Sequence, residues 1–204
     1  MRCSEADTWE SCSIVTVPAS RLHPNGLDNE HALQSPSEWV LRWACLIAAG
    51  GEVLDLACGS GRHSRYLASA GYHVCAVDRD AHAFAALTGV TGVSVQVADL
   101  ERAPWPLEGR CFAGIVVSNY LYRPLFPHVL DALAQDGVLI YETFALGNER
   151  FGKPSNPDFL LRPGELLELV RGKLRVLAYE DLRVSLPKPA MVQRICAVGP
   201  RWNP

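Results

Sequence analysis

The chain has 204 residues, of which 49% are hydrophobic and 20% are charged. These values are typical of a globular protein of one domain, and they exclude a disordered or fibrous chain. The 19 Lys and Arg residues and 22 Asp and Glu residues give a net charge of −3. A protein that binds a phosphate backbone usually has an excess of clustered Lys and Arg. A small-molecule partner is therefore favoured, and a nucleic-acid partner remains the alternative.

Seven cysteines are scattered along the chain, and no two of them form a C-x-x-C pair. This odd number and spacing argue against a disulfide framework and against a zinc site, so we expect no bound metal. The first thirty residues lack the basic and apolar regions of a signal peptide. No apolar run approaches the roughly 18 residues of a membrane span. We therefore expect a cytoplasmic protein without a membrane partner.

The first 35 residues show no sustained periodicity and end in turn-forming residues. We interpret residues 1–35 as an N-terminal extension or flap, with a short strand at 13–17 as the alternative. The remaining residues, 36–204, are predicted to form one domain. It begins with a helix over 35–51, with Ser35 as the N-cap and Pro36 as the first helical residue.

After this helix, short apolar runs alternate with helical patterns. Strands are predicted at 52–57, 73–78, 93–98, 112–119 and 137–144, and helices at 62–70, 80–88, 124–134 and 163–170. Two further β-rich runs, 174–184 and 190–199, flank a turn and predict an antiparallel hairpin. This alternation predicts an α/β fold, Rossmann-like and doubly wound, with a mostly parallel seven-stranded sheet and a C-terminal antiparallel hairpin.

The first strand leads into a glycine loop, Asp55-x-Ala57-x-Gly59-x-Gly61. A dinucleotide-binding loop needs a third glycine where this chain has Ser64. Asp55 would also repel a pyrophosphate at close range. A ligand with positive charges and no phosphate fits better, and S-adenosylmethionine (SAM) has both an ammonium and a sulfonium group. The alternative for Asp55 is a helix-capping side chain.

Acidic residues follow the next two strands, where ligands bind in doubly wound sheets. Asp78 ends the second strand and is placed to accept both ribose hydroxyls. Asp99 follows the third strand and is placed to accept the adenine amino group, with Leu100 or Trp105 against the ring. Both aspartates have a second interpretation as strand-end caps, and Trp105 has one as a core anchor.

The segments "DLACGSG", "AVDRD" and "VADLERAPW", together and in this order, resemble motifs I, II and III of class I SAM-dependent methyltransferases. The resemblance covers roughly residues 36–145, and Ala57 replaces the first glycine of the family loop. It implies that SAM is bound, with S-adenosylhomocysteine (SAH) as the product. The candidate cofactor-binding residues are Asp55, Ala57, Cys58, Gly59, Gly61, Asp78, Arg79, Asp99, Leu100 and Ser118.

The acceptor is expected beside the ends of the fourth and fifth strands. The candidate catalytic residues there are Asn119, Tyr120 and Glu142. Asn119-Tyr120-Leu121-Tyr122 lacks the prolines of the N-P-P-Y tetrapeptide that some methyltransferases of amino groups contain. Glu142 begins a segment that resembles "E-T-F…G…P…P-x-F-L-L…E-L" of a small bacterial methyltransferase group likened to tellurite-resistance methyltransferases. Glu142 is expected to act as a base or to accept a hydrogen bond from the substrate.

Other polar residues near this end have weaker claims. Arg123, Arg150 and Lys153 are candidates for binding an anionic substrate group, with solvated surface charge as the alternative. His63 and His128 are the histidines near the expected site and are candidate bases. The leading hypothesis is a SAM-dependent methyltransferase of a small molecule. The alternatives are an RNA or protein methyltransferase, a SAM-binding protein without turnover, and a nicotinamide oxidoreductase.

Overall fold

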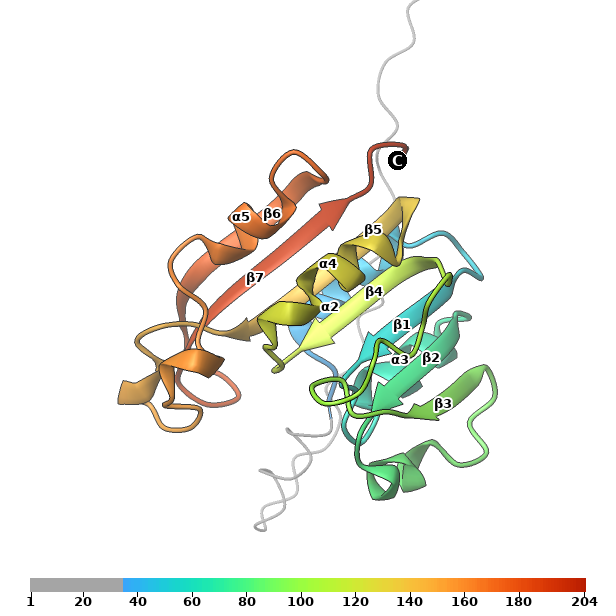
Figure 1. Ribbon diagram of the computed structural model, residues 1–204, viewed down its shortest axis with the longest axis horizontal. Coiled ribbons are helices and arrows are strands. Elements are labelled where there is room, and N and C mark those ends of the chain that lie inside the picture. The colour runs from blue at the N-terminus through green and yellow to red at the C-terminus, as the bar shows by residue number, and fades with distance from the viewer. Residues whose placement is uncertain (1–34) are drawn as a thin grey trace, which may run out of the picture.

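The computed structural model describes residues 35–204. The expected N-terminal flap and its alternative strand at 13–17 lie outside the described residues. The described chain forms one seven-stranded sheet in the order β3-β2-β1-β4-β5-β7-β6 (Figure 1). The strands are β1 Glu52–Leu56, β2 His73–Asp78, β3 Val93–Val97, β4 Phe112–Ser118, β5 Leu133–Phe144, β6 Arg175–Val184 and β7 Ala190–Val198.

The first five strands are parallel, and β7 is antiparallel to both of its neighbours, β5 and β6. The predicted fold class and the predicted C-terminal hairpin are therefore confirmed. The order changes direction beside β1, so that β2 and β4 flank it on opposite sides. In doubly wound sheets a crevice opens at this switch point, outside the carboxyl ends of the strands.

Helices cover both faces of the sheet. They are α2 Glu38–Trp43, α3 Arg62–Ser69, α4 Phe126–Asp131 and α5 Glu165–Val170, with short 3₁₀ helices η1 Ala44–Leu46, η2 Ala81–Leu87, η3 Arg123–Leu125, η4 Asn148–Arg150 and η5 Pro157–Phe159. Trp39 of α2 and Leu67 of α3 pack with Val53 and Val116 on one face. Val129 of α4 and Leu166 of α5 pack with Ile115 on the other. Figure 1 shows α4 and α5 in front of the sheet.

The first helix is shorter than predicted and begins later. Its N-cap is Ser37, whose backbone is extended and whose hydroxyl accepts a hydrogen bond from the backbone N of Trp39. The predicted N-cap, Ser35, lies two residues before it. The helix ends at Trp43 and continues only as the 3₁₀ turn η1, well before the predicted stop at 50–51. Both Ser35 and Ser37 have a hydroxyl that can cap a helix. Ser37 is the N-cap in the structure, and its hydroxyl also donates to Glu142 Oε1 of β5.

Two other helices differ from the prediction. The segment expected to be a helix at 80–88 is the 3₁₀ helix η2, although its N-cap is Asp80 as the pattern indicates. The helix expected over 124–134 ends at Asp131, because β5 begins already at Leu133, which pairs with Phe112 of β4. A register shift between Phe112 and Gly114 follows this early pairing. The remaining elements lie within two residues of the predicted ranges.

Candidate functional site

The loop between β1 and α3 brings its backbone to the carboxyl end of the sheet in a left-handed conformation. Ala57, Gly59 and Gly61 have φ values of 55°, 55° and 73°. A side chain at Gly61 would collide with Leu87 of η2, whereas the space beside Gly59 is open to 4 Å. The backbone N of Cys58 donates to the carbonyl O of Val77 in β2 at 3.0 Å. This loop therefore leaves its backbone accessible at Gly59 while it stays fixed to β2.

Asp55 lies in β1, two residues before the first left-handed glycine-loop residue that follows it, Ala57. Its side chain is 1% exposed and accepts a hydrogen bond from the hydroxyl of Ser64 at 2.6 Å. Burial raises the pKa of Asp55 to about 6, although the hydrogen bond from Ser64 acts in the opposite direction. Ser64 is the residue that replaces the third glycine of a dinucleotide loop. The observed contact corresponds to the alternative role of Asp55, in which it holds the first turn of α3.

Cys58 is also buried, at 7% exposed. Desolvation, together with the nearby carboxylates of Asp55 and Asp78, raises the pKa of its thiol. A thiol of this kind stays protonated and packs as a small apolar side chain. Its backbone, rather than its sulfur, contributes to the cradle.

Asp78 and Asp99 lie at the ends of neighbouring strands, as the sequence predicts. Asp78 Oδ2 accepts from the backbone N of Gly59 at 2.8 Å, and Oδ1 accepts from the backbone N of Asp80 at 3.0 Å. Asp99 Oδ1 accepts from the backbone N of Glu101 and of Arg102. Both carboxylates cap backbone turns and retain further lone pairs for a ligand. Asp78 also fixes the glycine loop.

The neighbours of these two aspartates differ in accessibility. Arg79 is exposed and Leu100 is buried at 7% exposed. Trp105 stacks on His128, with ring centroids 5.3 Å apart and an angle of 9° between the planes. One face of Trp105 is therefore covered by His128, and His128 makes a stacking contact rather than a contact typical of a base.

The end of β4 presents three polar residues in sequence. The hydroxyl of Ser118 accepts from Arg62 Nη2 at 3.1 Å. Asn119 is exposed, has a φ of 56°, and donates its backbone N to the carbonyl O of Glu142 at 2.9 Å. Burial raises the pKa of the Tyr120 hydroxyl, and Glu101 and Asp99 add to this effect. Tyr120 therefore lies on the side of the site where the adenosine is expected.

The Tyr120 hydroxyl is buried and has no hydrogen-bond partner among the described residues. Unpaired buried hydroxyls are uncommon in folded proteins because desolvation without a hydrogen bond is costly. The ring packs against the core that lies under α4 and α5. The carbonyl O of Tyr120 accepts from the hydroxyl of Tyr141.

Glu142, at the end of β5, is part of a charged network that reaches three other elements. Its Oε1 accepts from the hydroxyl of Ser37 at 2.7 Å, and its Oε2 accepts from Arg194 Nη1 of β7 at 3.2 Å. Arg194 also pairs with Glu180 of β6 at 2.6 Å and lies over the ring of Trp39. Both oxygens of Glu142 thus already accept a hydrogen bond, an arrangement that suits an anchoring side chain better than a base.

His63, in the first turn of α3, contacts the backbone of Ser37, whose hydroxyl donates to Glu142. The ring is 3% exposed, and its Nε2 accepts from the backbone N of Ser37 at 3.1 Å. Burial and the nearby Arg62 lower the pKa of His63 to about 3. The ring is therefore neutral at physiological pH, and the nitrogen that would take a proton is already an acceptor for the backbone. His63 attaches the start of α2 to α3.

Arg123, a candidate for binding substrate, is engaged within the protein. Its guanidinium pairs with Glu165 at 2.6 Å and donates to the carbonyl O of Asp158 and of Leu160. Glu165 is 8% exposed, and its hydrogen bond with Arg123 raises the pKa of the Arg123 guanidinium. Arg123 therefore fixes the loop after β5. Arg150 and Lys153, in that loop, are exposed.

Three polar residues of this site were not expected from the sequence: Ser37, Arg62 and Arg194. Arg62 follows Gly61 directly, and its position as the first helical residue beside the loop was an available signal. Ser37 and Arg194 reach Glu142 from 105 and 52 residues away along the chain. No local pattern indicates such contacts.

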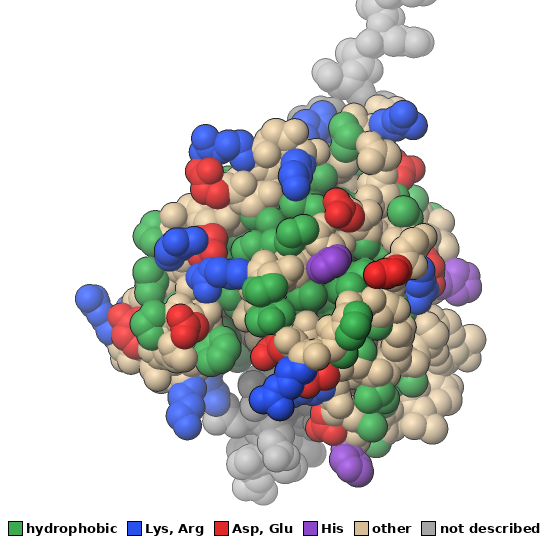
Figure 2. Space-filling view, in the orientation of Figure 1, with side chains coloured by type: hydrophobic (Ala, Val, Ile, Leu, Met, Phe, Trp, Pro, Cys, Tyr) green, Lys and Arg blue, Asp and Glu red, His purple; other side chains and the backbone are tan. Residues whose placement is uncertain are grey.

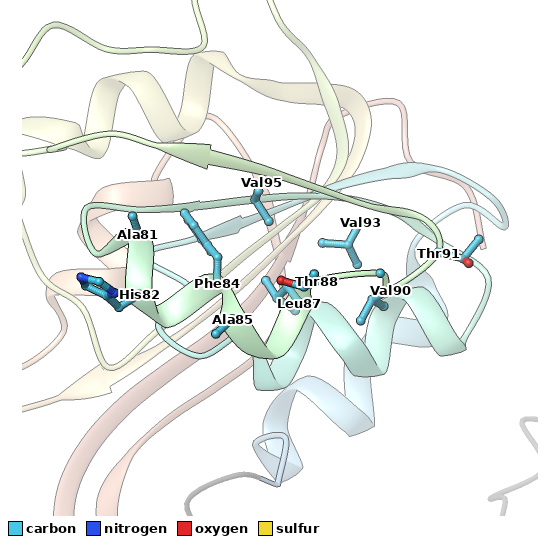
Figure 3. Close-up of a pocket in the computed structure, with 11 residues that line it drawn as sticks. Ala81, His82, Phe84, Ala85, Leu87, Thr88, Val90, Thr91, Val93 and Val95 are labelled. Carbon is cyan, nitrogen blue, oxygen red and sulfur yellow. The ribbon is translucent and has the colours of Figure 1, made fainter.

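An apolar groove lies away from these residues, between η2 and the edge strand β3 (Figure 3). It has a volume of about 680 Å³ and is lined by Phe84, Leu87, Val93 and Val95, among others. None of the predicted site residues lines it. Within the described chain, no three His, Cys, Asp or Glu side chains are grouped as metal ligands, and no helix is both long and apolar enough to cross a bilayer.

Comparison with known proteins adds to this geometry. Residues 53–137 match the family model of a methyltransferase domain. These residues contain β1, the glycine loop, Asp78, Asp99 and the end of β4. This segment of the chain is therefore similar to a methyltransferase domain. No curated protein matches the chain.

Solved methyltransferase structures share the fold of this domain. TehB from Haemophilus influenzae is 21% identical with a TM-score of 0.68, and the match covers 80% of this chain and 62% of TehB. The chain therefore spans about three fifths of that protein. A TehB-like SAM-dependent methyltransferase from Corynebacterium glutamicum is 20% identical with a TM-score of 0.61, covering 84% of this chain and 93% of that one.

A third similar structure contains a ligand. The glycopeptide N-methyltransferase MtfA, in complex with SAH, is 18% identical with a TM-score of 0.57. The match covers 79% of this chain and 88% of MtfA. At these identities the likeness concerns the fold, and the acceptors of these proteins are not transferred to this chain.

Proposed function

We propose that this protein transfers a methyl group from SAM to a small-molecule acceptor, with SAH as the second product. The observation that supports this most directly is the position of Asp78. Its carboxylate ends β2, receives the backbone N of Gly59, and stands beside the left-handed glycine loop. A ribose with two vicinal hydroxyls can donate to such a carboxylate.

The residues at this end of the sheet fit the parts of SAM. The open space beside Gly59 admits a close approach of the ligand to the backbone. The unpartnered hydroxyl of Tyr120 and the carboxylate of Asp99 lie on the expected adenosine side. When bound, SAM supplies an electrophilic methyl group on a positively charged sulfur.

The chain's own residues then have to align the acceptor and exclude water from it. Alignment of the two reacting atoms at about 3–3.5 Å can lower the barrier of a displacement by roughly 7–11 kcal/mol. We assign this task to Asn119 and Glu142, which the hydrogen bond from Asn119 N to Glu142 O joins at the ends of β4 and β5. Glu142 accepts a hydrogen bond from the acceptor, and any proton that the acceptor loses passes to water.

Two features support a small acceptor in the cytoplasm. On the face seen in Figure 2, basic side chains lie interspersed with acidic ones and form no continuous basic surface. The thiols of Cys58, Cys75, Cys111 and Cys196 form no disulfide, as in proteins of a reducing compartment.

The proposed function is tested by incubating the protein with methyl-labelled SAM and a fractionated cell extract. We expect label in a low-mass fraction together with an equal amount of SAH, and much less label with Asp78→Ala at a SAM concentration that does not saturate the wild type. Label in the RNA or protein fraction would support the alternative methyltransferase class. Binding of SAM without any SAH would support a SAM-binding protein without turnover.

A further inference from the structure

The two edge strands of the sheet differ in their protection against pairing with another chain. β6 carries four charged side chains, and its register with β7 shifts between Val176 and Ala178. β3 has the sequence Val-Ser-Val-Gln-Val, without a charge or a proline, and its register with β2 is continuous. Charged side chains and bulges are the usual features that keep an edge strand from pairing. β3 therefore lacks the protection that β6 has.

The outer backbone groups of β3 are available to another strand. β3 ends the strand order and pairs with β2 alone among the described strands (Figure 1). The backbone N of Ala98, directly after β3, donates to the carbonyl O of Asp78 in β2. Successive residues of a strand direct their backbone groups to opposite sides, so those of Val95 and Val97 point away from β2.

The side chains along this edge are apolar and exposed. Val95 and Val97 are 49% and 58% exposed. Val93 and Val95 also line the groove beside η2, together with Phe84 (Figure 3). His82 is the one titratable side chain among the residues that line this groove. The edge of β3 thus combines free backbone groups with apolar side chains and carries no charge, which is the composition of a strand that pairs with a like strand.

We propose that β3 pairs in an antiparallel manner with β3 of a second copy of this chain, so that two sheets join across a two-fold axis. This inference does not depend on the proposed function. The backbone N of Val93 already donates to the carbonyl O of Val90. The pairing that uses only free groups therefore places Val95 opposite Val97 of the second copy, with the axis at Gln96. Each of the two Val95–Val97 pairs then exchanges two backbone hydrogen bonds.

A second copy fits this edge because the surface is complementary to itself. An uncharged strand faces an uncharged strand, so no charges repel each other across the axis. Valine lies opposite valine in both pairs, and cross-strand pairs of β-branched residues stabilise a sheet. A partner with a charged strand would find no opposite charge on β3.

The size of the surface indicates how strong this dimer is. Eleven residues line the groove beside β3, whereas a standard interface has roughly 20–30 residues on each side. The dimer is therefore weak, with a dissociation constant in the micromolar range. The carboxyl ends of the two β3 strands point in opposite directions, so Asp78 and Asp99 of each copy stay at an open end of their own sheet.

The test measures the mass of the full chain by sedimentation velocity over a concentration series that spans the micromolar range. Val97→Lys places a charge on the β3 edge. Val176→Lys is the matched control, because Val176 lies on the other edge strand and is 38% exposed. Amide hydrogen exchange at Val95 and Val97 is followed over the same series.

We expect the wild type to pass from monomer to dimer as the concentration rises, with slower exchange at the amides of Val95 and Val97. Val97→Lys should raise the dissociation constant at least about tenfold, and Val176→Lys should leave it unchanged. A mixture of Val95→Glu and Val97→Lys should dimerise again, because the expected register places Glu opposite Lys.

Three results would overturn the inference. One is a monomer at every concentration. Another is a dimer that Val176→Lys weakens and Val97→Lys does not. The third is protection of the Val95 and Val97 amides that does not vary with concentration, which would mean that another part of the same chain covers the edge. Thermal unfolding and an SAH affinity within about twofold of the wild type verify that each variant is folded.

Discussion

Polar side chains at the ends of β1 to β3 and at the ends of β4 to β7 are held by different kinds of contact. In the first group, Asp55, Asp78 and Asp99 each accept hydrogen bonds from residues of the adjoining loops or turns. In the second group, Glu142 of β5 pairs with Arg194, and Arg123, just after β4, pairs with Glu165 of α5, from distant parts of the chain. The first group depends on local backbone geometry, and the second on the assembled sheet.

This difference separates cofactor binding from acceptor binding in the proposed function. The cofactor side is built by short loops whose residue types follow from backbone conformation. The acceptor side is built by side chains that meet only after β5, β6 and β7 have paired. Substitutions in the second group should therefore alter stability and acceptor use while leaving the affinity for SAH nearly unchanged.

The largest effect is expected from Arg123→Met. It leaves Glu165, which is 8% exposed, without its main partner. Loss of one member of such a pair destabilises a protein by about 3 kcal/mol. Urea unfolding should show this loss, and calorimetry should show an SAH affinity within about twofold of the wild type. Arg171→Met, which breaks the exposed pair with Glu168, is the control and should change stability by less than about 1 kcal/mol.

The second effect is expected from Asp78→Ala, on the cofactor side. Loss of the ribose acceptor and of the bond to Gly59 should weaken SAH binding at least about tenfold. Asp80→Ala removes a neighbouring carboxylate that caps η2 and should leave the affinity nearly unchanged. Equal affinities of the wild type and Asp78→Ala for SAH would refute the ribose assignment.

Site residues whose role follows from a local motif could be predicted from the sequence. Contacts between residues far apart along the chain could not. The glycine loop, Asp78 and Asp99 were found from local motifs, because each lies at a strand end. Arg123 was expected to bind substrate, but its partner Glu165 is 42 residues away. The N-cap was placed at Ser35 for the same reason, since the hydrogen bond between Ser37 and Glu142 joins residues 105 apart.

The third effect concerns pH. The pKa of His63 is lowered to about 3 in the folded protein, against about 6.5 in an unfolded chain. The unfolded state therefore binds more protons between these values. Stability should fall as the pH decreases from about 6.5 toward 3, by up to about 1.4 kcal/mol per pH unit.

Asp55 opposes this trend. Its folded pKa of about 6 lies above the ordinary value of 3.8, so the folded state binds more protons and stability falls as the pH rises from about 4 to 6. His63→Gln should reduce the acid destabilisation, and Asp55→Asn should steepen it. Unfolding free energies measured from pH 4 to 7 compare the three proteins. A pH dependence unaltered by either substitution would contradict both assignments.

The smallest effect on folding and cofactor binding is expected from Glu142→Gln. The amide retains an oxygen for Ser37 but turns a donor toward Arg194, at a cost of about 1 kcal/mol. SAH affinity should remain within about twofold, whereas label transfer to the natural acceptor should drop. Glu180→Gln removes the other partner of Arg194 and should leave transfer unchanged. Full transfer by Glu142→Gln would exclude its anchoring role.

The most direct test of the account is a crystal structure of the protein with SAH. We predict the ribose hydroxyls on Asp78 and the adenine near Asp99, at the carboxyl ends of β1, β2 and β3. SAH bound elsewhere, for example in the apolar groove between η2 and β3, would contradict the account.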